Sequence, residues 1–175
     1  MWGDVSITRD EALAMLEDGQ QKVDALVAQL SDEEQERPAT IGGGDWSAKD
    51  LLGHIARWNE IAIEALGSWR KGERPEIEDV WGDGVDRLNA QNYERSKADS
   101  PEQARERLRR SHDALVGAIR EMDNAEWHSE APYQTERRSW LGIMLGSITG
   151  APKRAYGHAF AHLPDLEKYV SELRQ

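Results

Sequence analysis

Two histidines near the C-terminus, His158 and His162, lie four residues apart. On a continuous helix this spacing places both imidazoles on one face, one turn apart, where they could bind the same ion. Neutral imidazole suits divalent Zn, Ni and Fe alike. The leading candidate for a third ligand is His54, which stands at the edge of an apolar stripe with Ile55 and Trp58. We therefore predict a metal site at His54, His158 and His162, with coordination positions left open for water or substrate.

The other two histidines are weaker candidates. His112 falls on the apolar face of Leu108, Leu115 and Ile119, so spacing alone does not exclude it as a ligand. His128 lies in a polar connector and is expected at the surface. A histidine pair at helical spacing is often structural or solvent-facing, so the pair alone does not establish a metal site.

The chain contains no cysteine, so a metal must use His, Asp or Glu ligands and the chain offers no thiolate nucleophile. Asp50 could orient the second ring nitrogen of His54. We favour its simpler role as a negative charge in the first turn of a helix. Core or cap packing is the favoured role of the tryptophans, and lining an apolar pocket near the metal is the minority reading for Trp81 or Trp140. Arg154 and Tyr156 could contact a substrate anion, although surface positions explain them equally well.

These side chains must be positioned by helices, because the apolar residues recur at helical intervals and no strand pattern is present. Helices are expected at about 9–30, 47–71 and 85–97, from Ser100 onward, and from about 140 to 175. The connector 31–45 should hold one short turn near 32–37, and 72–84 could form a lid. The last helical region is interrupted by Gly150 and Pro152, resumes from Pro152, and is kinked or restarted at Pro164. The sequence thus predicts an all-α four-helix bundle forming a single domain over residues 1–175.

The 33 acidic residues outnumber the 22 basic ones and give a formal net charge of -11. A field of this sign repels phosphates and anionic lipid, so neither nucleic acid nor a membrane is expected as a partner. The N-terminal residues have no basic leader followed by an apolar run, and a cytoplasmic protein is the expectation.

The run from Trp46 to Trp58, WSAKDLLGHIARW, resembles the second-helix signature of the DinB-like superfamily of four-helix bundles. The final helix is also similar, because HAFAH from His158 to His162 matches the pair that completes a three-histidine metal site with the second-helix histidine. The resemblance therefore implies the ligand set His54, His158 and His162. Pro164 and the Gly150 to Pro152 segment depart from the pattern by interrupting the helix on either side of the pair.

Members of that superfamily include thiol-dependent transferases and isomerases that use mycothiol or bacillithiol, and a branch related to colibactin self-resistance proteins. The resemblance implies a bacterial, homodimeric, metal-dependent transferase or hydrolase that acts on a small-molecule electrophile, with a low-molecular-weight thiol as a possible cofactor. The alternative is a metal-free bundle that binds a small molecule or toxin. A helical interaction protein acting through its dimer surface has no motif in its support.

Overall fold

The computed structural model describes residues 7–42, 44–80, 82–135, 137–150 and 154–175. Its elements, in chain order, are α1 Arg9–Val27, α2 Asp32–Glu36, α3 Ala48–Arg70, the 3-10 helix η1 Glu76–Asp79, α4 Asp83–Ser96, α5 Pro101–Glu121, α6 Asn124–Trp127, α7 Leu141–Ile148 and α8 His158–Glu172. In the described part of the chain no strand is present, only an isolated bridge between Glu130 and Trp140. The predicted all-α bundle is confirmed.

Local sequence explains where the helices begin. In four of them, a side chain just before the first turn accepts a hydrogen bond from the backbone three residues on, and the residue there bonds back. These capping boxes are Thr8 with Glu11, Ser31 with Glu34, Ser47 with Asp50, and Ser100 with Gln103. Each pair satisfies backbone N–H groups that a helix start leaves without partners.

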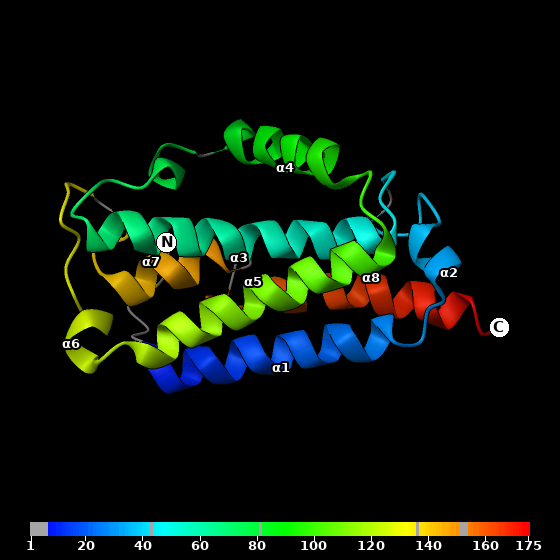
Figure 1. Cartoon of the computed structure of the whole chain (residues 1–175), viewed down its shortest axis with the longest axis horizontal. Helices are drawn as coiled ribbons and strands as arrows, with labels where there is room; N and C mark the ends of the chain where they lie inside the picture. The colour runs from blue at the N-terminus through cyan, green and yellow to red at the C-terminus, as the bar shows by residue number, and fades with distance from the viewer. Residues whose placement is uncertain (1–6, 43, 81, 136, 151–153) are drawn as a thin grey trace.

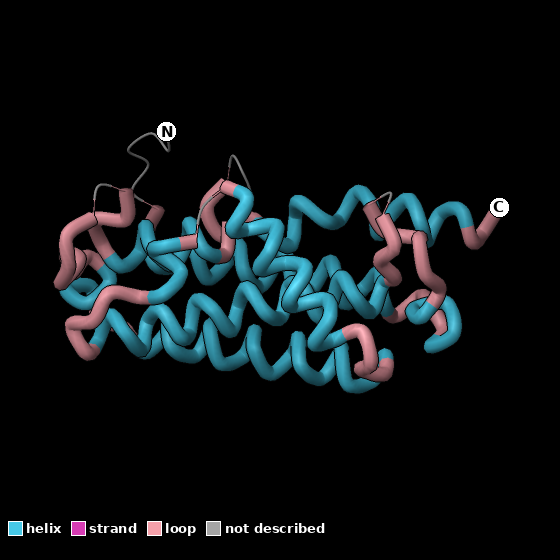
Figure 2. Tube along the Cα trace, turned by 90° about the horizontal axis from the view of Figure 1, so that it is seen from above, coloured by secondary structure: helices cyan, strands magenta, loops and turns pink. Residues whose placement is uncertain are grey.

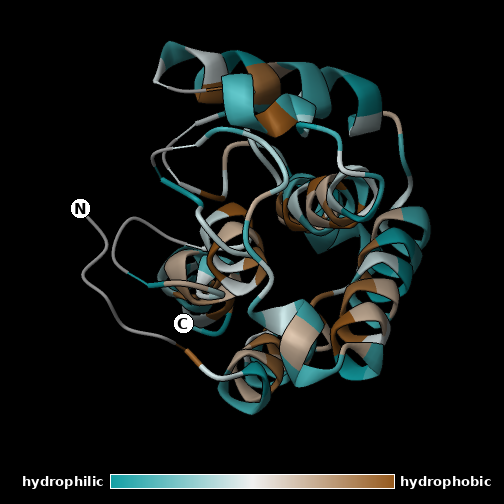
Figure 3. Cartoon of the chain, turned by 90° about the vertical axis from the view of Figure 1, so that its left-hand side faces the viewer, coloured by the Kyte–Doolittle hydropathy of each residue, from teal (hydrophilic) through white to brown (hydrophobic). Residues whose placement is uncertain are grey.

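Three long helices, α1, α3 and α5, run the length of the bundle, with α3 packed against α5, α4, α7 and α8. The fourth side is filled by two shorter helices, α7 and α8, which follow one another along the back of the bundle (Figure 1). Apolar residues of the long helices pack with α7 in one core cluster and with α8 in a second. Seen from above, the loops gather mainly at the two ends (Figure 2). Seen end-on, the hydrophobic faces turn towards the space between the helices (Figure 3).

The last helical region differs from the prediction at its start. The sequence suggested a helix resuming at Pro152, which lies outside the described residues, but α8 begins only at His158. The reason is Tyr156, which has a φ of 57° in the left-handed region and a side chain buried against the bundle. Its hydroxyl donates to the Gly142 carbonyl at 2.6 Å and its backbone N–H to the Gly146 carbonyl at 3.1 Å. The chain is thus fixed to α7 before α8 starts.

The other helix boundaries agree closely with those predicted from the sequence. Helix α8 continues through Pro164 without a restart. Helix α1 ends at Val27, three residues before the predicted end. Two predicted connectors hold short helices, η1 and α6, which have no apolar periodicity by which a sequence pattern could reveal them. No helix in the described ranges has the length and apolar character needed to cross a bilayer.

Candidate metal centre

Three histidines meet where α8 begins beside α3. His54 Nε2 lies 3.0 Å from His158 Nε2, which in turn lies 3.1 Å from His162 Nε2. Every pair of rings is T-shaped or edge-on, with centroids 4.8 to 5.0 Å apart. The three predicted residues are therefore brought together, each offering one ligand nitrogen, and these nitrogens lie within 4.8 Å of one another.

The positions of these side chains follow from the two helices. His54 lies in the N-terminal half of α3, between the core residues Leu51 and Ile55. His158 and His162 are the first and fifth residues of α8, so one helical turn separates them on the same face. The anchored Tyr156 sets where that first turn starts. The cluster thus depends on α3, α8 and the segment that leads into α8.

The nitrogen spacing fits a metal ion. Two bonds of about 2.1 Å from one ion place neighbouring nitrogens about 3.0 Å apart at a right angle and about 3.4 Å apart at the tetrahedral angle. The observed 3.0 and 3.1 Å of the two adjacent pairs match the first arrangement, and the third pair, His54 with His162, lies within 4.8 Å. Without an ion, a neutral imidazole has only one N–H to donate, so three nitrogens facing one another cannot all be satisfied. The donor set therefore suits a divalent cation with open positions.

The surroundings of the second ring nitrogens fit a metal site less well than the spacing of the ligand nitrogens does. In the described residues, His54 Nδ1 and His158 Nδ1 are buried without a hydrogen-bond partner, whereas a metal-bound imidazole usually donates its second N–H to an acceptor. Asp50 does not provide that acceptor. Its carboxylate accepts from the Ser47 backbone at 2.9 Å, from the Ser47 hydroxyl at 2.7 Å and from Lys49 at 3.1 Å. The favoured reading of Asp50 as a helix-start carboxylate agrees with these contacts.

Burial keeps the three imidazoles neutral. It lowers the pKa of His54 from 6.5 to about 3, and repulsion from a charged His162 adds to the effect. Burial, with the neighbouring His54 and His162, holds the pKa of His158 well below 6.5. The pKa of His162 is also lowered by burial, although the nearby Asp165 opposes the shift. Neutral imidazoles are the form that binds a metal, so no proton has to leave first near pH 7.

Aromatic rings enclose the cluster. Trp46 lies 4.9 Å from the His54 ring, and Trp58 lies 6.5 Å from His54 and 6.0 Å from His158, all between centroids. A cavity of about 540 Å³ opens at His162, and Trp46 and Tyr93 line it. Sequence reasoning missed this pair as site residues. Only the place of Trp46 in the motif before His54 could have suggested it.

Several other sequence candidates lie elsewhere. Tyr156 is a packing residue. Arg154 stacks over the Phe160 ring at 4.4 Å. Trp140 lines a separate cavity of about 970 Å³ together with His128, which is exposed as expected. His112 is half-buried and outside the cluster. Trp81 lies outside the described residues.

Comparison with solved structures shows a shared fold. An uncharacterised protein from Escherichia coli UTI89 is 17% identical, with a TM-score of 0.77 and 95% of each chain covered. The colibactin self-resistance protein ClbS, crystallised in complex with a dsDNA, is 15% identical, with a TM-score of 0.75 and 94% of this chain and 96% of that chain covered. A comparison with curated protein sequences found no match.

The ClbS complex corrects one expectation. The net charge of -11 led to the prediction that nucleic acid is not a partner. A close structural neighbour bound to duplex DNA contradicts that prediction. Net charge sums over the whole surface, whereas phosphate binding depends on the local arrangement of donors and cations. The predicted homodimer has no support from either neighbour's description.

The sequence matches one family model, that of the mycothiol maleylpyruvate isomerase N-terminal domain, over residues 16–147. The match includes His54 and ends before His158, so the other two histidines stand in the part of the chain that only the fold comparison covers. The matched range is well over half of the chain. This protein therefore belongs to the mycothiol maleylpyruvate isomerase N-terminal domain family, within the DinB-like superfamily.

Proposed function

We propose that this protein is a metal-dependent enzyme, a thiol-dependent transferase or a hydrolase, that acts on a small electrophile. The observation that carries the proposal is the cluster of His54, His158 and His162, whose ligand nitrogens lie within 4.8 Å of one another, with adjacent nitrogens 3.0 and 3.1 Å apart. The family supports the thiol, because its name includes mycothiol. Zn, Ni and Fe are all compatible with three imidazole ligands.

A divalent ion in such a site supplies a Lewis acid that lowers the pKa of a bound thiol or water and so makes a nucleophile available near neutral pH. The protein's own residues do the rest. His54, His158 and His162 would hold the ion as neutral ligands. Trp46 and Trp58 keep bulk water from the His54 side. Because the chain has no cysteine, any thiol must enter as a separate molecule, and the cavity at His162 gives it a route.

The test is a titration of cobalt-loaded protein with mycothiol or another low-molecular-weight thiol. Thiol binding at the cluster should produce a sulfur-to-cobalt absorption band and raise the melting temperature, because a ligand that binds only the folded state stabilises it. The His158→Ala variant should show neither change, and His128→Ala should behave like wild type. If the thiol alters neither the metal spectrum nor the melting temperature of loaded wild type, the thiol-dependent reading is wrong.

A second candidate is a metal-independent binding protein of the self-resistance kind. It is favoured by the cavity itself, whose aromatic wall of Trp46 and Tyr93 could hold a ligand without an ion, and by the fold shared with ClbS. This reading predicts that His158→Ala leaves ligand affinity intact. Because ClbS was crystallised with a dsDNA, duplex DNA is one ligand to test, by fluorescence anisotropy at low and at physiological salt.

A further inference from the structure

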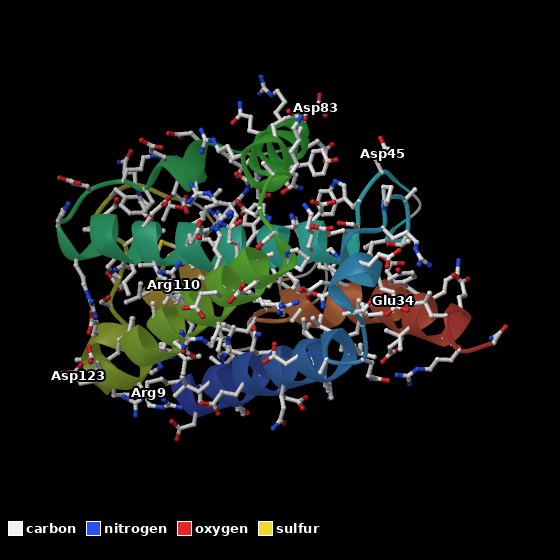
Figure 4. The ribbon with its side chains drawn as sticks, turned by 45° about the vertical axis from the view of Figure 1, so that its right-hand side comes forward. Arg9, Glu34, Asp45, Asp83, Arg110 and Asp123 are labelled. Carbon is white, nitrogen blue, oxygen red and sulfur yellow. The ribbon has the colours of Figure 1, made fainter. Side chains whose placement is uncertain are left out.

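The cavity beside the histidine cluster is lined by acidic and aromatic side chains that are not needed to bind a metal ion. It lies between the connector before α3, helix α4 and the first turns of α8, and His162 forms part of its wall. Figure 4 shows Asp45 on that connector, on the same side of the bundle as α4. With about 540 Å³ it has the size of a small-molecule site. Any substrate that reaches the cluster by this route passes its lining.

Three carboxylates line the cavity, one from each wall: Asp45 on the connector, Glu94 on α4 and Asp165 on α8. No lysine or arginine is among the described residues that line it. Glu94 pairs with Lys97, one turn along α4. Asp45 and Asp165 have no ion pair with a lysine or arginine in the described part of the chain. Asp45 and Asp165 therefore give the cavity negative charge that no lysine or arginine of the described residues balances.

Two aromatic side chains also line the cavity, beside the apolar Ile41 and Ala90. Trp46 and Tyr93 lie nearly parallel, with an interplanar angle of 7° and centroids 6.2 Å apart, and both line the cavity. The faces of such rings attract cations through their quadrupole, and tryptophan does so most strongly. Aromatic faces beside carboxylates are the arrangement that recognises organic ammonium groups. An inorganic ion would gain little from the rings, and a neutral apolar ligand would gain nothing from the carboxylates.

We propose that this cavity selects substrates that carry an organic cation, an ammonium or guanidinium group attached to a flat apolar body, and rejects carboxylates. The inference rests on the function proposed above in that it makes the cavity the mouth of the histidine centre. The proposal excludes maleylpyruvate as a substrate of this protein, because its two carboxylates would meet Asp45, Glu94 and Asp165 at short range. Like charges placed in one site repel, and a cavity lined with one sign raises the local concentration of the opposite one.

The test compares tryptamine with indole-3-acetate, which share the indole ring and carry opposite charges. Isothermal titration on the full chain, both as purified and zinc-loaded, should show tryptamine binding about tenfold or more tightly than indole-3-acetate at low salt, with the preference shrinking as salt screens the carboxylates. Equal affinity, or tighter binding of indole-3-acetate to the protein as purified, overturns the proposal.

Two substitutions that each remove one negative charge test whether the preference for tryptamine arises in the cavity. Asp165→Asn should weaken tryptamine binding about three- to tenfold, the loss expected for one partly exposed charge contact. The control Glu167→Gln removes the same charge from an exposed position two residues along α8 and should leave the affinity unchanged. An equal effect of both variants would mean that only the overall charge matters, which contradicts the assignment to the cavity.

Metal content, measured on the same samples, separates this inference from the proposed function. Tryptamine selectivity in a protein that binds no metal would leave the cavity assignment standing and refute the metal enzyme. A protein that binds metal but does not prefer tryptamine would refute the cavity assignment and leave the metal enzyme standing. Loss of metal in Asp165→Asn, with tryptamine affinity unchanged, would make Asp165 a support for His162 and refute the cation site.

Discussion

Burial decides the protonation state of the clustered histidines and gives them a pH signature. In the metal-free protein the pKa of His54 falls from 6.5 to about 3 on folding, because the charged ring loses its hydration. Between these two values the unfolded chain binds a proton that the folded chain does not. The contribution of the neutral His54 ring to the free energy of unfolding is therefore fully present above about pH 6.5, and it is lost progressively as the pH falls from 6.5 towards 3.

We predict that chelator-treated wild type loses about 1 to 2 kcal/mol more stability between pH 7 and pH 5 than the His54→Gln variant, which has no titrating ring at this position. Urea unfolding at the two pH values measures the difference. Equal losses in the two proteins would show that the His54 ring is solvated in the metal-free state.

The residues that hold the candidate metal could be predicted, and those that surround it could not. His158 and His162 follow from helical spacing, and His54 from its place at the edge of an apolar stripe. Tyr93 becomes a neighbour of Trp46 and His162 only through the packing of α4 against α3. No local pattern encodes that packing, because the residues come from three separate parts of the chain.

At the scale of elements, the start of α8 is the feature that positions two of the three histidines. The left-handed backbone of Tyr156 turns the chain, and its buried ring and hydroxyl attach the turn to α7. Gly146 of α7 makes room for it, since a Cβ there would lie 2.6 Å from the Tyr156 ring. Helix periodicity could not place this start, because the break is set by contacts with α7.

Replacing Tyr156 with Phe should lower the free energy of unfolding by about 1 to 2 kcal/mol, because the Gly142 carbonyl loses its buried partner. It should also weaken metal binding, since His158 is two residues away. The matched control is Tyr133→Phe. Among the described residues the Tyr133 hydroxyl donates only to the Met144 sulfur, at 3.5 Å, so its loss should cost less. Urea unfolding and zinc titration compare them. The prediction is wrong if the two variants are equally stable.

Pro164 is the second sequence feature that bears on α8. The helix continues through it, so the carbonyl of residue 160 receives no backbone N–H from position 164. Pro164→Ala restores that donor at an exposed position and should raise the free energy of unfolding by about 1 to 2 kcal/mol, the gain being reduced by the freer unfolded chain. Thermal unfolding tests this, and a lower melting temperature would mean that the proline is required for the path of α8.

At the scale of the whole molecule, the bundle is built on three long helices shared by two core clusters, with α7 closing one and α8 the other. This division puts the histidine cluster beside the junction of α7 and α8, where a broken helix leaves room for polar side chains within an apolar bundle. The fold class followed from the sequence because helical periodicity and capping residues are local. The expected single domain over residues 1–175 stays a prediction.

Whole-molecule charge proved a poor guide to partners. The net charge of -11 describes the average surface, yet a protein of the same fold was crystallised with duplex DNA. Local charge is more informative, as in the cavity lined by Asp45, Glu94 and Asp165. Ligand preference in this fold is therefore best sought at individual cavities and surfaces.

The central claim is that the three histidines bind one divalent ion, and elemental analysis of the untagged protein tests it most directly. After reconstitution with Zn, Ni or Fe, wild type and the exposed-histidine control His128→Ala should each retain about one equivalent of metal per chain, the stoichiometry of a single three-histidine site. His54→Ala and His158→Ala should retain almost none. A wild type that stays empty with all three metals, or variants that keep their metal, would contradict the claim.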